Sequence, residues 1–391
     1  MNILHFCPRY APARGGSENY VKTISERLAA DGNEVTVVTT TAIDHDALYC
    51  EHLSHSLPGP EQLNGVDILR FPPDFHIKDP RIRKPCFHST GMAHFVNSLE
   101  RGRYDIVNAA CLPFANMIAE ARRAADTLGR ALVVTPFLHT HPRLSAVYQT
   151  PRLISAVSLA DRIVAQTEHE AEFLVRRWRI PRRRITVLGV GVDFRAVETR
   201  VQQAENASPF PTFVFLGTHD ELKGTATVLD VSRRFDTDAV HFVFAGDMTQ
   251  SFRSYMQHHG RALPDNAQLL GAVDERTKHD LLARMTCLVV PSAAESFGQV
   301  YLEAWMHKKP VIAARHGATA CLIEDHRNGR LVEFGDLDGL EAAIRGYLEE
   351  PARARAHGRA GFKAAKAYDW SLLMPRLNRL YRETVVCTSA P

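Results

Sequence analysis

Short apolar runs that alternate with helix-length segments constrain the fold of this chain more than any other feature. In the first half these runs lie at residues 3–7, 35–38, 68–71, 105–109, 131–137, 162–166 and 185–188. In the second half they lie at residues 212–216, 241–245, 267–271, 287–290, 311–314 and 331–334. Runs of this length, separated by about one helix each, are typical of parallel sheets covered by helices. The pattern predicts two α/β domains, each a Rossmann-like, doubly wound sheet.

A polar, proline-containing stretch separates the two series and predicts the domain boundaries. A chain of 391 residues is too long for one hydrophobic core. We expect a first domain at 1–197, a linker at 198–211 and a second domain at 212–369, followed by an amphipathic helix at 370–391. Two such domains favour a ligand in a cleft beyond the carboxyl ends of their strands.

Composition limits the class of protein. The net charge of +3, with no basic block interleaved with aromatic residues, gives no indication of nucleic-acid binding. Seven scattered cysteines without a Cys-x-x-Cys pair favour reduced thiols. Neither a secretion signal nor a run of about 20 apolar residues is present, so we expect a cytoplasmic protein. The arginine-rich residues 176–184 are typical of a solvated helix end, with contact to anionic lipid as the alternative.

The most informative polar residues lie between 291 and 310. Ser296 and Gln299 have the spacing of a capping box, which predicts a helix that starts just after Ser296. The amides of Phe297 and Gly298 would then be free and would favour an anion.

Two carboxylates accompany this predicted helix. Glu295 precedes its start, and Glu303 lies about two turns further on, on the same face. An anion-binding end between two carboxylates suits a ligand with a sugar, a negatively charged middle and a hydroxyl-rich far end, which describes a nucleotide sugar. The structural alternatives are a favourable charge at the helix start for Glu295 and a surface pair with His307 for Glu303.

Candidate residues in the first half also follow predicted strands. Gly15 and Gly16 lie between the first strand and the first helix, where glycine lets a phosphate approach the backbone closely; a purely structural turn is the alternative. His139 closes another strand and could donate to a sugar hydroxyl or transfer a proton. With His141 it could bind a metal, but no third ligand has a matching spacing, so we predict no metal.

The second half contributes three more candidates. Lys223 stands just before a glycine and a helix, where its charge could contact a diphosphate; a solvated lysine is equally plausible. Gly246 and Val273 lie in turns after strands, where backbone groups could frame a base or could serve only the turn.

Together these motifs resemble the retaining glycosyltransferases of family 4, which have the GT-B fold. The resemblance covers nearly the whole chain and is most specific in the Glu295-x7-Glu303 pattern. It extends to the Gly-Gly-Ser-Glu sequence at 15–18, to His139 and to Lys223-Gly224. It implies transfer of a sugar from a nucleotide diphosphate sugar, such as a UDP-sugar, to an acceptor hydroxyl, without a required metal or other cofactor. The C-terminal helix would cross back to the first domain.

The resemblance also implies roles for the donor-site residues. Glu303 would bind the ribose hydroxyls. Glu295, with the amides of Phe297 and Gly298, would hold the donor sugar. Lys223 would bind the diphosphate.

On the first domain, the amide of Gly16 would also bind the diphosphate, and His139 would lie beside the reacting centre. One departure from the family pattern is Thr218, which stands where an arginine usually faces the phosphates; Arg14 and Arg315 are alternative sources of that charge.

Other functions stay open at this stage. These are another GT-B activity, such as nucleotide-sugar epimerisation or phosphorolysis, and a non-catalytic sugar-nucleotide-binding protein. The acceptor is a small molecule, a glycan or a lipid-linked sugar, and peripheral contact with the inner membrane is an alternative to a purely cytoplasmic location. We expect acceptor choice to depend on the irregular loops at 40–66 and 72–95.

Overall fold

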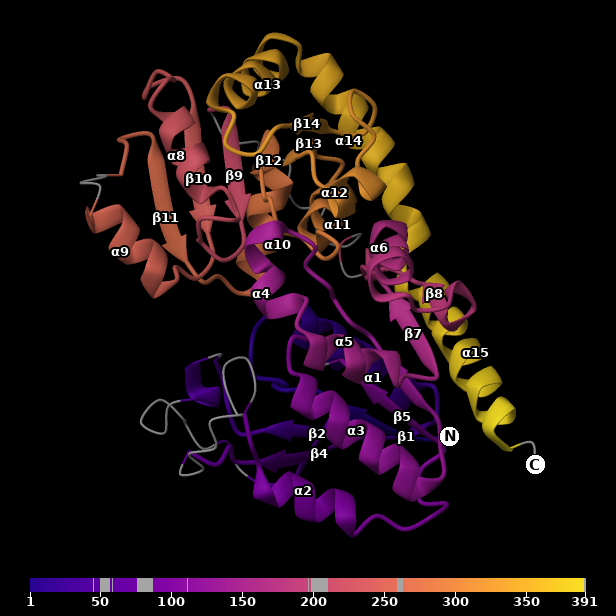
Figure 1. Ribbon diagram of the computed structural model, residues 1–391. Coiled ribbons are helices and arrows are strands. Elements are labelled where there is room, and N and C mark those ends of the chain that lie inside the picture. Colours follow the sequence, from indigo (N-terminus) through magenta and orange to yellow (C-terminus); the bar gives the residue numbers. More distant parts are fainter. Residues whose placement is uncertain are drawn as a thin grey trace. The chain divides into compact units, whose positions relative to one another are not determined.

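The computed structural model describes residues 1–44, 46–49, 57, 59–75, 87–110, 112–195, 197, 210–258 and 263–389. The chain divides into two compact units (Figure 1). Unit 1 comprises Met1–Val190 together with Ser371–Pro391, and unit 2 comprises Gly191–Trp370. Each unit contains one sheet with helices between its strands, which confirms the predicted pair of α/β domains.

Unit 1 is built on an eight-stranded sheet in the order β3-β4-β2-β1-β5-β6-β7-β8, in which all pairings are parallel except that of β3 with β4. The strands are β1 (Asn2–Phe6), β2 (Glu34–Thr40), β3 (Glu61–Leu63), β4 (Val66–Phe71), β5 (Ile106–Ala109), β6 (Leu132–Val134), β7 (Arg162–Ala165) and β8 (Ile185–Val187). The helices are α1 (Gly16–Ala30), α2 (Thr90–Asn97), α3 (Ala115–Leu128), α4 (Ser145–Tyr148), α5 (Pro151–Ser158) and α6 (Glu168–Trp178).

Unit 2 has a six-stranded, fully parallel sheet in the order β11-β10-β9-β12-β13-β14. The strands are β9 (Thr212–Leu216), β10 (His241–Ala245), β11 (Ala267–Gly271), β12 (Cys287–Val290), β13 (Val311–Ala314) and β14 (Arg330–Val332). The helices are α8 (Thr225–Ser232), α9 (Gln250–His258), α10 (Glu275–Arg284), α11 (Gln299–Met306), α12 (Gly317–Leu322), α13 (Leu337–Glu349) and α14 (Pro351–Ala365).

Burial explains why these segments form strands. The central strands β5 and β12 are buried at every residue, as expected for parallel strands covered on both faces. In unit 2, Phe213 stacks on Phe242 with ring centroids 5.6 Å apart, and Phe215 stacks on Phe244 at 5.9 Å. Aromatic stacking across adjacent strands fixes the register and keeps the carboxyl ends of the strands level.

The expected loops at 40–66 and 72–95 contain more structure than predicted. The edge strand β3, a 3-10 turn at Asp46–Leu48 and helix α2 lie in these segments. The sequence did not predict β3, because Glu61–Leu63 is largely polar and a short edge strand does not need an apolar run. Much of the remainder, at 50–56 and 76–86, lies outside the described residues.

The first unit ends earlier than the expected boundary at 197, between Val190 and Gly191. Two backbone hydrogen bonds tie residue 192 into unit 2, from the Val192 amide to the Tyr368 carbonyl at 2.9 Å and from the Trp370 amide to the Val192 carbonyl at 3.1 Å. Nearly all of the expected linker at 198–211 lies outside the described residues.

The C-terminal helix α15 (Trp370–Ser389) continues from unit 2 into unit 1, as expected. Its apolar face is buried, and the Tyr381 hydroxyl lies 3.4 Å from the His5 ring of β1. Asn378 donates to the Asp31 carboxylate at 3.1 Å. None of the helices that the structure describes combines the length and apolar character needed to cross a membrane.

Candidate functional site

In unit 2 the predicted site residues follow the carboxyl ends of neighbouring strands. Lys223 lies in the loop after β9, Gly246 after β10, Val273 after β11 and Glu295 after β12. Because β11, β10, β9 and β12 are adjacent and parallel, these loops lie along one edge of the sheet. The topology therefore brings together candidates that are up to 72 residues apart in sequence.

Lys223 and Glu295 form an ion pair, with 2.7 Å between the Lys223 Nζ and the Glu295 Oε1 atoms. The Asp220 carboxylate accepts a hydrogen bond from the Lys223 amide at 2.8 Å and so orients the loop after β9. Gly224 adopts a left-handed conformation, and a Cβ at this position would lie 2.5 Å from the Pro291 carbonyl oxygen. Glycine thus allows the two loops to approach closely enough for Lys223 to reach Glu295.

Helix α11 does not begin just after Ser296, as the capping-box pattern predicted. It begins at Gln299, its N-cap is Gly298 with a φ of 97°, and no side chain caps it. The Tyr301 ring lies against Gly298, where a Cβ would be 2.6 Å from the ring, and the Tyr301 hydroxyl donates to the Val290 carbonyl at 2.7 Å. Tyr301 therefore holds the start of the helix against β12.

The turn before α11 keeps two backbone donors open. Within the described residues, the amides of Phe297 and Gly298 have no hydrogen-bond acceptor. Phe297 itself is buried and packs edge-on against Tyr368, with 5.3 Å between the ring centroids. Two unpaired amides at a helix start, which follow Glu295 closely in sequence, can bind an anion or a polar hydroxyl group.

Glu303 is buried and pairs with Lys278 of α10, with 3.0 Å between the Oε1 and Nζ atoms. Burial alone would lower the pKa of Lys278, but the negative charges of Glu303 and Glu275 outweigh it and raise the pKa. The alternative surface pair of Glu303 with His307 is wrong, since the His307 ring contacts His279 at 2.9 Å instead. Lys278 was not identified from the sequence, because its partner lies on another helix 25 residues away.

Gly246 has a structural role. Its φ is 140°, and a Cβ at this position would lie 2.0 Å from the Gly217 carbonyl oxygen. Its amide donates to the Gly271 carbonyl at 2.8 Å, so that donor is already used. Val273 lies in the loop just before Asp274, whose carboxylate caps α10 by accepting from the Thr277 amide at 2.7 Å.

The loop after β9 lacks a positive charge at its first positions. Thr218 is exposed, and the neighbouring His219 is buried between Phe215 and Phe244. Burial lowers the pKa of His219 to about 4, so its ring is neutral at pH 7. Of the two alternative arginines, Arg315 pairs with Asp325 at 2.7 Å.

In unit 1, the amino end of α1 is already occupied by a carboxylate. Gly15 has a φ of 156°, and a Cβ at this position would lie 2.1 Å from the Glu18 Oε2 atom. The Glu18 carboxylate thus folds back over Gly15, and it forms an ion pair with Arg9. Arg14 beside them is exposed and, within the described residues, has no ion pair. Glycine at position 15 is therefore required by close packing against Glu18.

His139 follows β6 and packs edge-on against Tyr148, with 5.0 Å between the ring centroids. The buried Glu170 holds this segment in place, since its carboxylate accepts from the Leu138 amide at 2.7 Å and from the Gln166 amide at 2.6 Å. Burial raises the pKa of Glu170 to about 7, although both hydrogen bonds act in the opposite direction. The sequence signal for Glu170 was the Thr-x-x-Glu spacing from Thr167, which predicts a helix start but not this contact.

A hollow of about 310 Å³ adjoins the Glu18 carboxylate in unit 1. Its polar lining residues are Arg9, Ser17 and Glu18. Its apolar lining comes from the segment after β5 and from α4 and includes Leu112, Pro113, Phe114, Val147 and Tyr148. A lining that combines polar groups with aromatic and aliphatic side chains suits a ligand with several hydroxyl groups on an apolar ring.

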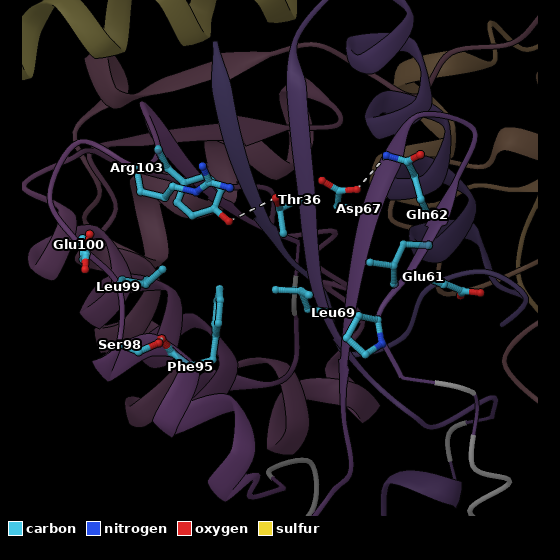
Figure 2. Close-up of a pocket in the computed structure, with 13 residues that line it drawn as sticks. Thr36, Glu61, Gln62, Asp67, Leu69, Phe95, Ser98, Leu99, Glu100 and Arg103 are labelled. Atoms are coloured by element: carbon cyan, nitrogen blue, oxygen red, sulfur yellow. Dashed lines mark hydrogen bonds between the residues drawn. The ribbon is translucent and has the colours of Figure 1, made fainter.

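A larger hollow in unit 1, of about 580 Å³, lies elsewhere on the sheet (Figure 2). It contains Thr36 and Asp67 near the starts of β2 and β4, and Phe95 and Leu99 face it from the end of α2. The predicted residues follow the opposite, carboxyl ends of the strands, so this hollow is not part of the candidate site. Within the described residues, no group of three or more His, Cys, Asp or Glu side chains is placed to hold a metal ion.

Comparison with known proteins supports these observations over most of the chain. A family model described as Glycosyltransferase Family 4 matches residues 14–195, and one described as Glycosyl transferases group 1 matches residues 210–350. The chain is 25% identical to D-inositol 3-phosphate glycosyltransferase 2 of Catenulispora acidiphila, over 98% of this chain and 94% of that protein. It is also 25% identical to the phosphatidyl-myo-inositol mannosyltransferase of Mycobacterium leprae, over 100% of this chain and 98% of the relative.

Solved structures share the fold at lower identity. The structure of Anabaena Alr3699/HepE in complex with UDP superposes with a TM-score of 0.74 at 17% identity, covering 98% of this chain and 100% of that one. Sucrose-phosphate synthase from Thermosynechococcus elongatus superposes with a TM-score of 0.75 at 18% identity, covering 99% and 100%.

Proposed function

Because this chain belongs to the family 4 glycosyltransferases, enzymes that move a sugar from a nucleotide sugar to an acceptor, we propose specific roles for its site residues in a retaining transfer. The observation that carries the proposal is the pair of buried or half-buried carboxylates, Glu295 and Glu303, each held by a lysine at the carboxyl edge of the unit 2 sheet.

Glu303 binds the ribose of the donor in this proposal. One of its oxygens accepts from Lys278, and the remaining lone pairs can accept from two vicinal hydroxyls. Lys278 supplies the counter-charge to the carboxylate in its buried position. Glu303 and Lys278 therefore act as one unit in donor binding.

In this proposal, Lys223 binds the donor diphosphate and Glu295 binds the transferred sugar. The Lys223 ammonium group has three donors and uses one of them on Glu295, which leaves two for the donor diphosphate. Glu295 and the amides of Phe297 and Gly298 bind the hydroxyls of the transferred sugar. We propose that Lys223 stabilises the leaving diphosphate and that no metal ion is needed for this step.

For unit 1 we propose that His139 acts in the transfer step. We assign the Gly16 amide no role, because the Glu18 carboxylate lies against Gly15 at the start of α1. No carboxylate is proposed as a covalent nucleophile; the leaving diphosphate deprotonates the acceptor hydroxyl on the same face, so the configuration of the sugar is retained. We place the acceptor in the hollow beside Glu18, because its polar and aromatic lining residues match a hydroxylated ring. Relatives named for inositol phosphate and phosphatidylinositol support a polyol acceptor.

UDP-sugars are the first donors to test, since UDP is bound in the solved structure of a protein with the same fold. Calorimetric titration identifies the donor, and NMR of the product reports its anomeric configuration. Glu303→Gln should weaken donor binding about tenfold or more, because charge-assisted hydrogen bonds contribute roughly 1.5–3 kcal/mol each. Glu295→Ala and His139→Ala should lower kcat, and chelation with EDTA should leave activity unchanged.

The matched control is Glu26→Ala, which removes a carboxylate that pairs with Lys22 on the surface of α1. This variant should keep both donor binding and turnover. Full transfer activity in all three site variants would refute the site assignment, and donor binding without transfer to any acceptor would refute the catalytic proposal. Cytoplasmic location and a peripheral membrane contact stay predictions.

A further inference from the structure

A pocket in unit 2 lies at the opposite edge of the sheet from Lys223 and Glu295. It has a volume of about 510 Å³ and is formed by residues that immediately precede three neighbouring strands: 210–211 before β9, 284–286 before β12 and 307–310 before β13. The end of α13 and the start of α14 complete it. We call this the amino-edge pocket, since these parallel strands all begin there.

The charge of the amino-edge pocket is one-sided. Four positively charged residues line it and none of the lining residues is acidic; they are Arg284, Lys308, Lys309 and Arg355. Burial lowers the pKa of the fifth basic residue, His307, to about 3, so its ring is neutral at pH 7. His307 contacts His279, and Lys308 lies over the Phe362 ring at 5.2 Å. For Arg284, Lys309 and Arg355, the described part of the chain provides no ion-pair partner. Several cations gathered in a concave site without a counter-charge favour an anionic ligand.

Lys309 is the central cation of this pocket. It is half-buried, and burial lowers the pKa of its ammonium group without any carboxylate to offset the effect. An unpaired charge on the half-buried Lys309 ammonium group destabilises the protein, and a bound anion would offset this cost. Lys309 thus resembles Lys223 and Lys278 in burial, but it lacks the glutamate that each of those residues has.

The backbone around Lys309 is fixed. The Lys309 amide donates to the Ala304 carbonyl at 3.1 Å, and Lys308 takes a left-handed φ of 56°. Gly358 of α14 packs against this turn, where a Cβ would lie 1.9 Å from the Lys308 carbonyl oxygen. The close approach of α14 to the end of α11 therefore sets the position of Lys309 before any ligand binds.

Most of the remaining lining is apolar and limits the kind of anion. Phe210, Met285, Pro310, Leu348 and Pro351 surround the basic groups. The volume lies within the range of about 300–1,000 Å³ that small-molecule sites occupy, and it is much larger than an inorganic anion requires. The pocket suits a small molecule with a phosphate at one end and an apolar ring or chain at the other.

We propose that the amino-edge pocket is a second ligand site of this chain, separate from the donor site, and that it binds a small organic phosphate through Lys309, Arg284 and Arg355. It does not depend on the proposed roles of Glu295 and Glu303. The two sites lie at opposite ends of α11, whose first turn belongs to the donor site and whose last turn leads into Lys309.

Phenyl phosphate, with phenol as its uncharged counterpart, tests this proposal by isothermal titration calorimetry on the full chain. The wild type should bind phenyl phosphate and not phenol. Lys309→Gln and Arg284→Gln should each weaken binding about tenfold or more, as expected for the loss of one charge-assisted contact. Two independent variants, both checked for an unchanged melting temperature, keep the test valid if one of them folds poorly.

Two controls separate this site from other anion-binding surfaces. Lys366→Gln removes an exposed lysine of the same unit that lies over Phe362, and it should leave binding unchanged. Lys223→Ala should also leave it unchanged, because Lys223 belongs to the donor site. The proposal is overturned if phenyl phosphate does not bind, or if anionic vesicles bind where phenyl phosphate does not. It is also overturned if only Lys223→Ala abolishes binding, or if Lys366→Gln weakens binding as much as Lys309→Gln.

Discussion

Replacing Lys278 by methionine tests whether the Lys278–Glu303 pair is the charged unit on which donor binding depends. Methionine keeps most of the length and apolar volume of the lysine side chain and removes only the ammonium group. Both side chains of the pair are nearly buried, with exposed fractions of 13% for Lys278 and 11% for Glu303. The substitution therefore leaves a carboxyl group in an apolar place without its main counter-charge.

The expected cost follows from the geometry of the pair. Two unit charges 3.0 Å apart attract each other by about 5 kcal/mol at an effective dielectric constant of 20. Desolvation of both groups offsets part of this attraction, and breaking a buried pair typically costs about 3–5 kcal/mol. We expect Lys278→Met to lower the free energy of unfolding by about 3 kcal/mol at pH 7.

The same change should weaken donor binding. Without Lys278, the Glu303 carboxylate loses the ammonium group that lies 3.0 Å from its Oε1 atom and holds it in position. Donor affinity of the variant should therefore fall about tenfold or more relative to the wild type, as expected for the loss of a charge-assisted contact. Urea unfolding measures stability, and calorimetric titration measures donor affinity.

Lys22→Met is the matched control, because Lys22 pairs with Glu26 at 3.3 Å on an accessible surface. Exposed pairs of this kind contribute about 0–1 kcal/mol. If Lys278→Met cost no more stability than Lys22→Met and left donor affinity unchanged, the pair would not be the charged unit proposed here.

Two further predictions concern the segments that position the site. The raised pKa of Glu170 means that the folded state favours the protonated form of its carboxyl group. The stabilisation that results is fully present below pH 4.5, the pKa of the unfolded state, and it is lost as pH rises through the folded-state pKa of about 7. The stability of the wild type relative to Glu170→Gln should accordingly fall by about 3 kcal/mol between pH 4.5 and 7.5 in urea titrations, and a constant difference would contradict the assignment. Ser296→Ala should change the free energy of unfolding by less than about 0.5 kcal/mol, because Ser296 caps no helix. Gly298→Ala should lower it by more than about 1 kcal/mol, because Gly298 has a positive φ and the Tyr301 ring fills the space of a Cβ. Equal melting temperatures for the two variants would refute this interpretation.

The strands of unit 2 could be predicted closely from the sequence. The predicted runs at 212–216, 241–245, 267–271, 287–290 and 311–314 coincide with β9 to β13. The interior strands β9, β10, β12 and β13 are buried along most of their length, so an apolar run marks each of them in the sequence. The edge strand β11 is mostly exposed, but its two adjacent leucines still mark it. The edge strand β3 at Glu61–Leu63 needs no such run, and nothing local marks it.

The partners of the charged residues could not be predicted. Glu303 was visible as a carboxylate on a helix, but its pairing with Lys278 depends on how α10 packs beside α11. Glu170 was visible as a first-turn acid of a helix, but its carboxylate reaches the Leu138 amide 32 residues away. Spacing rules describe neighbours within one element, and these contacts join different elements.

The incorrect start of α11 shows how a local rule can fail at the candidate site. A capping serine at 296 would have accepted a hydrogen bond, through its side-chain oxygen, from a backbone amide of the first helical turn. That contact would have used one of the amide donors that we propose for ligand binding. In the structure Gly298 takes the N-cap position, the Tyr301 ring holds it in place, and the amides of Phe297 and Gly298 have no acceptor within the described residues. A helix start that is uncapped and held by packing gives up some local stability, and in exchange it keeps its amides available to a bound ligand.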